Sequence, residues 1–156
     1  SVTGNEYVES AHGITIKADL TFEQAELEQA ELLMLPGGMP GATNLNDHEG
    51  VRRALAAQNA RGGKIAAICA APLVLGSLGL LKGKRATCYP GFEQYMTGAT
   101  YTAELLTVDG NITTGRGPAA TLPYAYAILA SFVGEEKTAE VRDGMIYTQL
   151  MKEAQD

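Results

Sequence analysis

The fold of this 156-residue chain is decided by one stretch, Ile65-Ala66-Ala67-Ile68-Cys69-Ala70-Ala71-Pro72. Its first four residues form a continuous apolar run, which is typical of a strand buried on both faces of a sheet. Pro72 fits the first turn of a helix, where its missing N–H costs nothing, and the apolar residues that follow extend that helix to about Leu78. The stretch therefore predicts a buried strand, a sharp turn at Cys69 and a helix.

Cys69 is the first candidate for chemistry. It stands at the carboxyl end of the predicted strand, the edge of an open α/β sheet where ligands bind. The N-terminus of a helix offers free N–H groups and a positive partial charge, which stabilise a thiolate over a thiol. The same strand–turn–helix arrangement exposes nucleophiles in other enzymes. The alternative is an inert core cysteine, because free cysteines are among the most buried residues.

Strands and helices alternate on both sides of this stretch. Upstream, the apolar run Leu32–Leu35 predicts a second buried strand, and a helix capped by Asn46 or Asp47 runs to about Ala60. Its buried face is predicted at helical spacing, by Val51, Leu55 and Gln58. The other upstream elements are two short strands around His12-Gly13 and a short helix or turn at 22–31.

Downstream, the sequence predicts a strand at 85–89, a hairpin at 105–114 joined at Asp109-Gly110, and two helices. The helices span about 119–132 and 136–141. Alternation of this kind predicts an α/β fold with a mainly parallel sheet and helices on both faces.

Composition restricts the class of protein further. With 46% hydrophobic residues, residues 1–156 are long enough for a single domain around one core. The net charge of -6 and the absence of any run of Lys or Arg disfavour nucleic acid and anionic membranes as partners. No apolar stretch is long enough to span a membrane, and no secretory signal is evident. Two cysteines form no disulfide framework, which favours a reducing, cytoplasmic location.

Two glycine-rich loops are the other candidate site elements. Gly37 and Gly38 follow the strand at 32–35, and glycines there would let backbone N–H groups approach a ligand and form an oxyanion hole beside Cys69. On these residues alone a plain tight turn is favoured, and the spacing matches no nucleotide-binding loop. In Gly115-Arg116-Gly117-Pro118, Arg116 is a candidate to hold a small anion or carboxylate, against the alternative of a solvated arginine.

Neither histidine is a strong catalytic candidate. His12 falls in an early turn, and His48 lies in Asp47-His48-Glu49 at a predicted helix start. Adjacent residues point in different directions, so this trio is interpreted as a charged helix cap and no metal site is predicted.

Three motifs together resemble the ThiJ/PfpI superfamily. They are Leu35-Pro36-Gly37-Gly38, Ala66-Ala67-Ile68-Cys69-Ala70-Ala71-Pro72 and Gly115-Arg116-Gly117-Pro118, and the resemblance covers nearly the whole chain. Within this superfamily, the branch that the chain resembles is the one that contains the Parkinson-associated protein deglycase and the bacterial ThiJ-type proteins. The resemblance implies a flavodoxin-like three-layer sandwich, similar to the class I glutamine amidotransferases, a homodimer and no cofactor.

The resemblance also implies roles for individual residues. Cys69 is then the catalytic nucleophile and redox-sensitive thiol, and Gly38 and Ala70 supply the oxyanion-hole N–H groups. The other residues expected to line the substrate or oxyanion site are Gly37, Tyr89, Arg116 and Pro118.

The sequence departs from the family pattern at two points. A histidine that the branch often carries is matched by Tyr89, a poor base near neutral pH, so amidase or protease chemistry is disfavoured. The family's protonated glutamate, from the first strand–helix connection, has no match. We therefore expect a missing N-terminal β-α-β unit of roughly 30–40 residues, either removed from this chain or present as a separate chain.

Three functions remain open from the sequence. The first is a glyoxalase or deglycase, in which Cys69 attacks methylglyoxal or a glycated adduct. The second is a non-enzymatic oxidative-stress sensor or chaperone that works through oxidation of Cys69. The third is thiamine-precursor (thiazole monophosphate) biosynthesis, a family-level assignment that none of these residues supports mechanistically.

Overall fold

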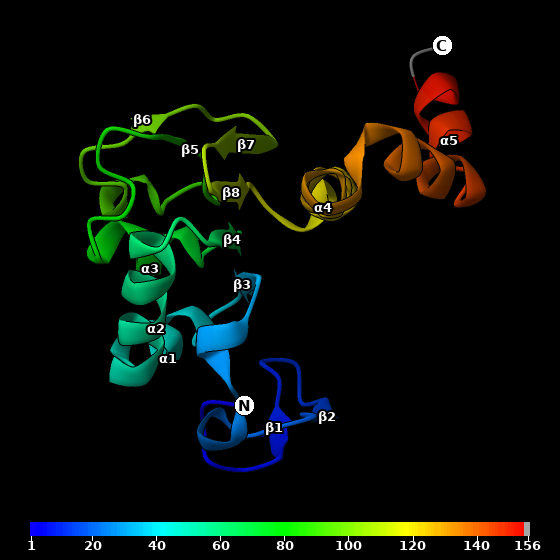
Figure 1. Cartoon of the computed structure of the whole chain (residues 1–156). Coiled ribbons are helices and arrows are strands. Elements are labelled where there is room, and N and C mark those ends of the chain that lie inside the picture. Colours follow the sequence, from blue (N-terminus) through cyan, green and yellow to red (C-terminus); the bar gives the residue numbers. More distant parts are fainter. Residues whose placement is uncertain (155–156) are drawn as a thin grey trace.

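Three parallel strands and one antiparallel strand form the main sheet (Figure 1). The computed structural model describes residues 1–154. The sheet has the order β3-β4-β8-β7, formed by β3 (Leu32–Leu35), β4 (Lys64–Ile68), β8 (Ile112–Gly115) and β7 (Leu106–Asp109). β4 pairs in parallel with β3 and β8, whereas β7 is antiparallel to β8. The apolar run at 65–68 thus forms an inner strand of the sheet, and its residues Ile65, Ala66 and Ala67 are buried, as the sequence predicted.

Helices cover both faces of this sheet (Figure 1). One face carries α1 (Gly41–Asp47), α2 (Glu49–Ala60) and α3 (Pro72–Ser77), and the other carries α4 (Thr121–Gly144). The predicted fold class, a flavodoxin-like three-layer α/β sandwich with a mainly parallel sheet, is confirmed.

The core lies between the sheet and the α1–α3 layer. Ile65 and Ala67 of β4 point into it, next to Ile112 of β8, and all three are at most 1% exposed. Leu55 of α2 is buried to the same degree and contributes roughly 1.5–3 kcal/mol by leaving water.

Helix α2 forms as predicted, but its start differs. Its residues Val51, Leu55 and Gln58 are buried, at the predicted spacing. The predicted cap at Asn46 or Asp47 is wrong, because the chain is already helical there in α1. The break falls at His48, whose Nδ1 accepts a 3.1 Å hydrogen bond from the backbone N–H of Val51 and so caps α2.

Strand β3 is not buried on both faces, contrary to the prediction. Leu35 is buried, but Met34 is 57% exposed. β3 is the edge strand of the sheet within residues 1–154, and α4 packs against β8 and β7 at the other side. The face of β3 on the α4 side is therefore left uncovered.

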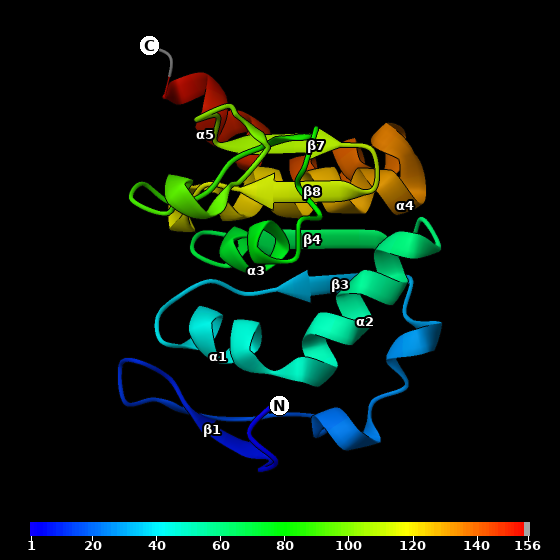
Figure 2. The same ribbon diagram turned by 90° about the vertical axis from the view of Figure 1, so that its left-hand side faces the viewer.

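The remaining strands are short. β1 (Tyr7–Glu9) and β2 (Thr15–Lys17) form the predicted N-terminal hairpin, which lies beyond the β3 edge of the sheet (Figure 2). The strand expected at 85–89 is limited to β5 (Arg85–Ala86), which pairs with β6 (Thr100–Tyr101). The predicted β7–β8 hairpin is present, but its turn falls one residue later, at Gly110–Asn111.

Short 3₁₀ helices and a terminal helix complete the chain. The 3₁₀ helices are η1 (Phe22–Gln24), η2 (Leu27–Gln29), η3 (Glu93–Tyr95) and η4 (Pro118–Ala120). Gly134, with φ of 81°, interrupts α4 at the break that the sequence predicted between its two downstream helices. Helix α5 (Tyr147–Glu153) was not predicted. Within residues 1–154, no helix combines the length and the apolar character needed to cross a membrane.

Candidate active site at Cys69

Cys69 occupies a sharp turn directly after β4. Its φ of 65° lies in the left-handed region, which costs a residue other than glycine roughly 1–3 kcal/mol. Two hydrogen bonds hold it there, from its own N–H to the carbonyl of Gly115 and from the N–H of Tyr89 to its carbonyl, both 2.9 Å. α3 begins at Pro72, as predicted. The strained, partly exposed cysteine between a strand and a helix has the geometry of a nucleophile elbow.

The loop after β3 lies directly against this turn. A β-carbon on Gly37 would stand 2.5 Å from the Cβ and 3.2 Å from the Sγ of Cys69. Glycine is therefore required here for close approach of the two loops. Gly38 follows with φ of 92°, and no backbone hydrogen bond outside the helices and strands of residues 1–154 uses the N–H of Gly38 or Ala70 as donor. The structure thus brings Gly37 to the elbow, and Gly38 and Ala70 are the next residues along the two loops that meet there.

Tyr89 reaches the same place from the segment after β5. Its ring packs on Gly117, where a β-carbon would stand 3.2 Å from the tyrosine Cδ2, and its side chain is partly exposed. Pro118 begins η4 immediately after Gly117. Tyr89, Gly117 and Pro118 therefore lie along one edge of the region around Cys69.

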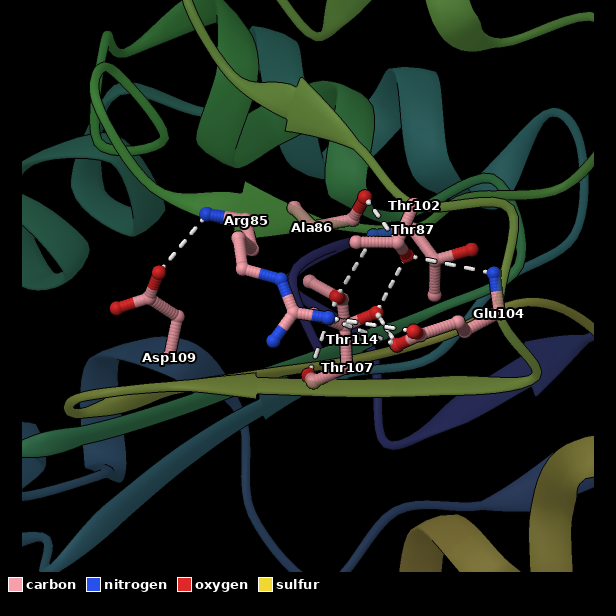
Figure 3. Close-up of polar contacts among 8 residues, drawn as sticks. All are labelled: Arg85, Ala86, Thr87, Thr102, Glu104, Thr107, Asp109 and Thr114. Atoms are coloured by element: carbon pink, nitrogen blue, oxygen red, sulfur yellow. Dashed lines mark hydrogen bonds and ion pairs between the residues drawn. The ribbon is translucent and has the colours of Figure 1, made fainter.

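The segment that carries Tyr89 is anchored by buried threonines (Figure 3). The backbone N–H of Thr87 donates to the Oγ1 of Thr114 on β8 at 2.9 Å, and both residues are buried. Beyond β5, this hydrogen bond holds the segment where the sequence predicted the strand to continue to residue 89. The outer contacts of the same network join Arg85 to Asp109 and Glu104, and Thr102 to Thr107.

Arg116 is engaged with its own neighbours. Its Nη1 donates to the carbonyl of Ala103, and its positive charge acts on Cys88 and Glu93. Its predicted role toward a substrate anion stays a prediction.

Burial raises the pKa of the Cys88 thiol to about 11, with a further increase from the negative charge of Glu93. Glu93 is held ionised: hydrogen bonds from its own backbone and from Gly91 N–H lower its pKa. No sequence pattern indicates the interaction between Cys88 and Glu93, because neither residue lies in a motif that predicts a contact between them.

The histidines lie away from this region. His48 caps α2 and packs against Phe22 in a tilted arrangement, with the ring centroids 4.6 Å apart, and His12 is in the exposed turn between β1 and β2. Within residues 1–154, no three His, Cys, Asp or Glu side chains gather in a way that would suit a metal ion.

The mainly parallel sheet carries a nucleophile elbow at the end of an inner strand. These two features place the chain in the class of flavodoxin-like α/β proteins with a cysteine at the elbow. The sequence profile of the DJ-1/PfpI family matches residues 1–131, and the chain belongs to that family. Protein DJ-1 homolog B of Arabidopsis thaliana is 36% identical over 94% of this chain, which spans only about a third (34%) of that relative. A deglycase of Pyrococcus horikoshii is 35% identical over 78% of this chain and 72% of its own length.

A solved structure agrees with the fold. The crystal structure of Drosophila melanogaster DJ-1beta superimposes with a TM-score of 0.85 at 32% identity, over 93% of this chain and 79% of that one. The resemblance that the motifs indicated is therefore confirmed at the level of family and fold.

Proposed function

We propose that this chain carries the reactive centre of a cysteine-dependent enzyme of the glyoxalase or deglycase type, acting on methylglyoxal or glycated adducts. The observation that supports the proposal most is the packing of Gly37 against the Cβ and Sγ of Cys69, in the loop that continues into Gly38. The name of the Pyrococcus horikoshii relative, a deglycase, favours the same chemistry.

The proposed reaction begins at the Cys69 sulfur. The thiolate attacks the aldehyde carbon of methylglyoxal and forms a hemithioacetal, whose oxyanion accepts hydrogen bonds from the N–H groups of Gly38 and Ala70. A proton then moves from the former aldehyde carbon to the neighbouring carbon, which yields a lactoyl thioester. Water hydrolyses this thioester to lactate and the free thiol. The proton transfer needs a carboxyl group, which we propose lies in polypeptide outside residues 1–156.

Lactate formation from methylglyoxal tests this function. The protein expressed from its whole reading frame should produce lactate, Cys69→Ser should not, and Cys88→Ser should retain the activity because Cys88 is fully buried. Equal rates in the wild type and Cys69→Ser would exclude the mechanism.

A redox sensor is the second candidate, and the contrast between the two cysteines favours it. Cys69 is partly exposed, whereas Cys88 is fully buried with a pKa of about 11. Oxidation follows thiolate character and access, so mild peroxide should modify Cys69 first. Mass spectrometry that found Cys88 modified before Cys69 would rule out the sensor.

A further inference from the structure

Cys88 is the second cysteine of the chain, and the lactate-forming reaction does not use it. Its side chain is fully buried, in the same core cluster as Ala70 and Ala71 of the turn that follows Cys69. A buried free cysteine is ordinarily an inert core residue. Cys88 differs from such a residue in where it lies, because it is held beside the reactive cysteine.

A backbone hydrogen bond brings the two cysteines together. The N–H of Tyr89, which belongs to the peptide directly after Cys88, donates to the carbonyl oxygen of Cys69 at 2.9 Å. Standard backbone dimensions then place the α-carbons of Cys69 and Cys88 no more than about 8 Å apart. Disulfides join α-carbons that are roughly 4.4–6.8 Å apart. A bridge between these two residues therefore needs a small movement at most.

Cys69 is the side that can move. The segment of Cys88 is anchored, because the backbone N–H of Thr87 donates to the Oγ1 of Thr114 at 2.9 Å (Figure 3). The side chain of Cys69 is partly exposed, and its sulfur lies beside Gly37. Rotation between staggered wells about its Cα–Cβ bond turns this sulfur away from Gly37.

The two thiols are in different states before any oxidation. Burial raises the pKa of the Cys88 thiol to about 11, and the negative charge of Glu93 acts in the same direction. A thiolate at Cys69 raises this pKa as well, so the two sulfur atoms lie within electrostatic range of each other. Peroxides react with accessible thiolates. Hydrogen peroxide therefore spares Cys88, which stays a neutral thiol beside the oxidised Cys69.

We propose that Cys88 is the resolving thiol of Cys69, so that oxidation of the reactive centre ends in a reversible Cys69–Cys88 disulfide. The Cys69 thiolate attacks one oxygen of hydrogen peroxide, the O–O bond breaks, and a sulfenic acid and hydroxide form. The Cys88 sulfur then attacks the Cys69 sulfur. The S–S bond forms, the S–O bond breaks, and the hydroxyl group leaves as water with the proton of the Cys88 thiol. A dithiol reductant returns both cysteines to thiols.

The disulfide deepens the redox sensor described above and rests on the oxidation of Cys69. Without a resolving thiol, more peroxide converts the sulfenic acid to a sulfinic acid, which thiol reductants do not reverse. A neighbouring thiol in the same chain acts at a high effective concentration. Cys88 thus competes with dilute peroxide for the sulfenic acid, and the reactive cysteine is recovered by reduction.

Peptide mapping of the protein expressed from its whole reading frame tests the disulfide. The protein is treated with hydrogen peroxide in slight molar excess, alkylated and digested without reductant. We expect a linked pair of peptides that contain Cys69 and Cys88 and that separate on addition of dithiothreitol. In Cys88→Ala, sulfinic acid at Cys69 should accumulate at least ~10-fold faster than in the wild type.

The double variant Cys88→Ala/Ala86→Cys is the matched control. Position 86 is also fully buried, so the variant keeps a second buried thiol. This thiol lies two residues farther from the peptide that is bonded to Cys69, which is roughly 7 Å along an extended segment. We expect no linked peptides and the same rate of sulfinic acid formation as in Cys88→Ala.

Three outcomes would overturn the proposal. The first is sulfinic acid in the wild type at the rate of Cys88→Ala without linked peptides, after which the sensor stands but has no resolving thiol. The second is a disulfide that joins the Cys69 residues of two chains, because Cys88 is then not the partner. The third is a Cys69 that peroxide leaves unmodified, which removes the sensor and the disulfide together. The lactate assay enters none of these readouts, so each failure is distinguishable from failure of the proposed enzyme.

Discussion

Gly37 lies so close to Cys69 that a β-carbon on the glycine would be 2.5 Å from the cysteine Cβ and 2.7 Å from the carbonyl oxygen of Ile68. Ile68 is the last residue of β4 and Cys69 follows it directly, and β4 is held in the sheet by pairing on both sides. The position of the thiol and the shape of the β3 loop are therefore coupled.

Gly37→Ala tests this coupling. We expect a loss of about 1–3 kcal/mol in the free energy of unfolding, because rigid backbone atoms must move to admit the methyl group. The lactate-forming rate should fall by roughly 100-fold, the cost that a displacement of about 1 Å at a reacting group can reach. Chemical denaturation and the lactate assay measure the two effects.

Gly41→Ala is the matched control for that substitution. A β-carbon there meets nothing within 4 Å, and the residue begins α1. Alanine in a helix is favoured over glycine by up to about 1 kcal/mol, so stability should be unchanged or slightly higher. If Gly37→Ala behaved like Gly41→Ala, the coupling between the two loops would be wrong.

The central part of the fold followed from local sequence because local chemistry determines it. A continuous apolar run, Pro72 at a first helical turn and glycine at a hairpin turn each restrict the backbone within a few residues. The predicted cap of α2 was wrong because Asn and Asp favour helix caps only on average. Here Asn46 and Asp47 are already part of α1. The exposure of Met34 was not predictable, because it depends on which elements lie beside β3.

In the site too, the features that are contiguous in the sequence were predictable and the contacts between distant segments were not. Cys69 was found because its strand, turn and helix are contiguous in the sequence. The hydrogen bond from Tyr89 N–H to the Cys69 carbonyl and the approach of Glu93 to Arg116 join distant segments, so spacing could not indicate them. The family resemblance indicated Tyr89 as a site residue, but it did not predict that the ring of Tyr89 packs on Gly117.

The left-handed backbone of Cys69 leads to a prediction on stability. Cys69→Gly should be more stable than Cys69→Ala by about 0.5–1 kcal/mol, because relief of a left-handed conformation (about 1–2 kcal/mol) exceeds the added chain entropy of glycine. At the exposed position 56 in α2 the order should be reversed, and Ala56→Gly should be less stable than the protein with alanine there. Thermal or urea unfolding of the variants would decide, and a less stable Cys69→Gly would contradict the strain at this residue.

The buried Cys88 predicts a loss of stability at high pH. Its pKa is about 11 in the folded protein, above the ordinary value of 9.0. A group whose pKa is raised by folding contributes stability fully below its unfolded pKa and loses that contribution as the pH rises through the folded value. Between pH 9 and 11, the wild type should therefore lose about 1–3 kcal/mol more than Cys88→Ala. If the free energies of unfolding of the wild type and Cys88→Ala fell by the same amount over this pH range, this contribution would be refuted.

The buried bond between Thr87 and Thr114 gives the last prediction. Thr114→Val keeps the shape of the side chain but removes the only acceptor that the backbone N–H of Thr87 has within residues 1–154. An unsatisfied buried donor costs about 1–3 kcal/mol, and we expect that loss in urea unfolding. Thr113→Val, one residue earlier on the half-buried face of β8, removes a hydroxyl without orphaning a buried donor and should change stability by less than about 0.5 kcal/mol. Equal effects of the two substitutions would mean that this bond does not anchor the segment leading to Tyr89.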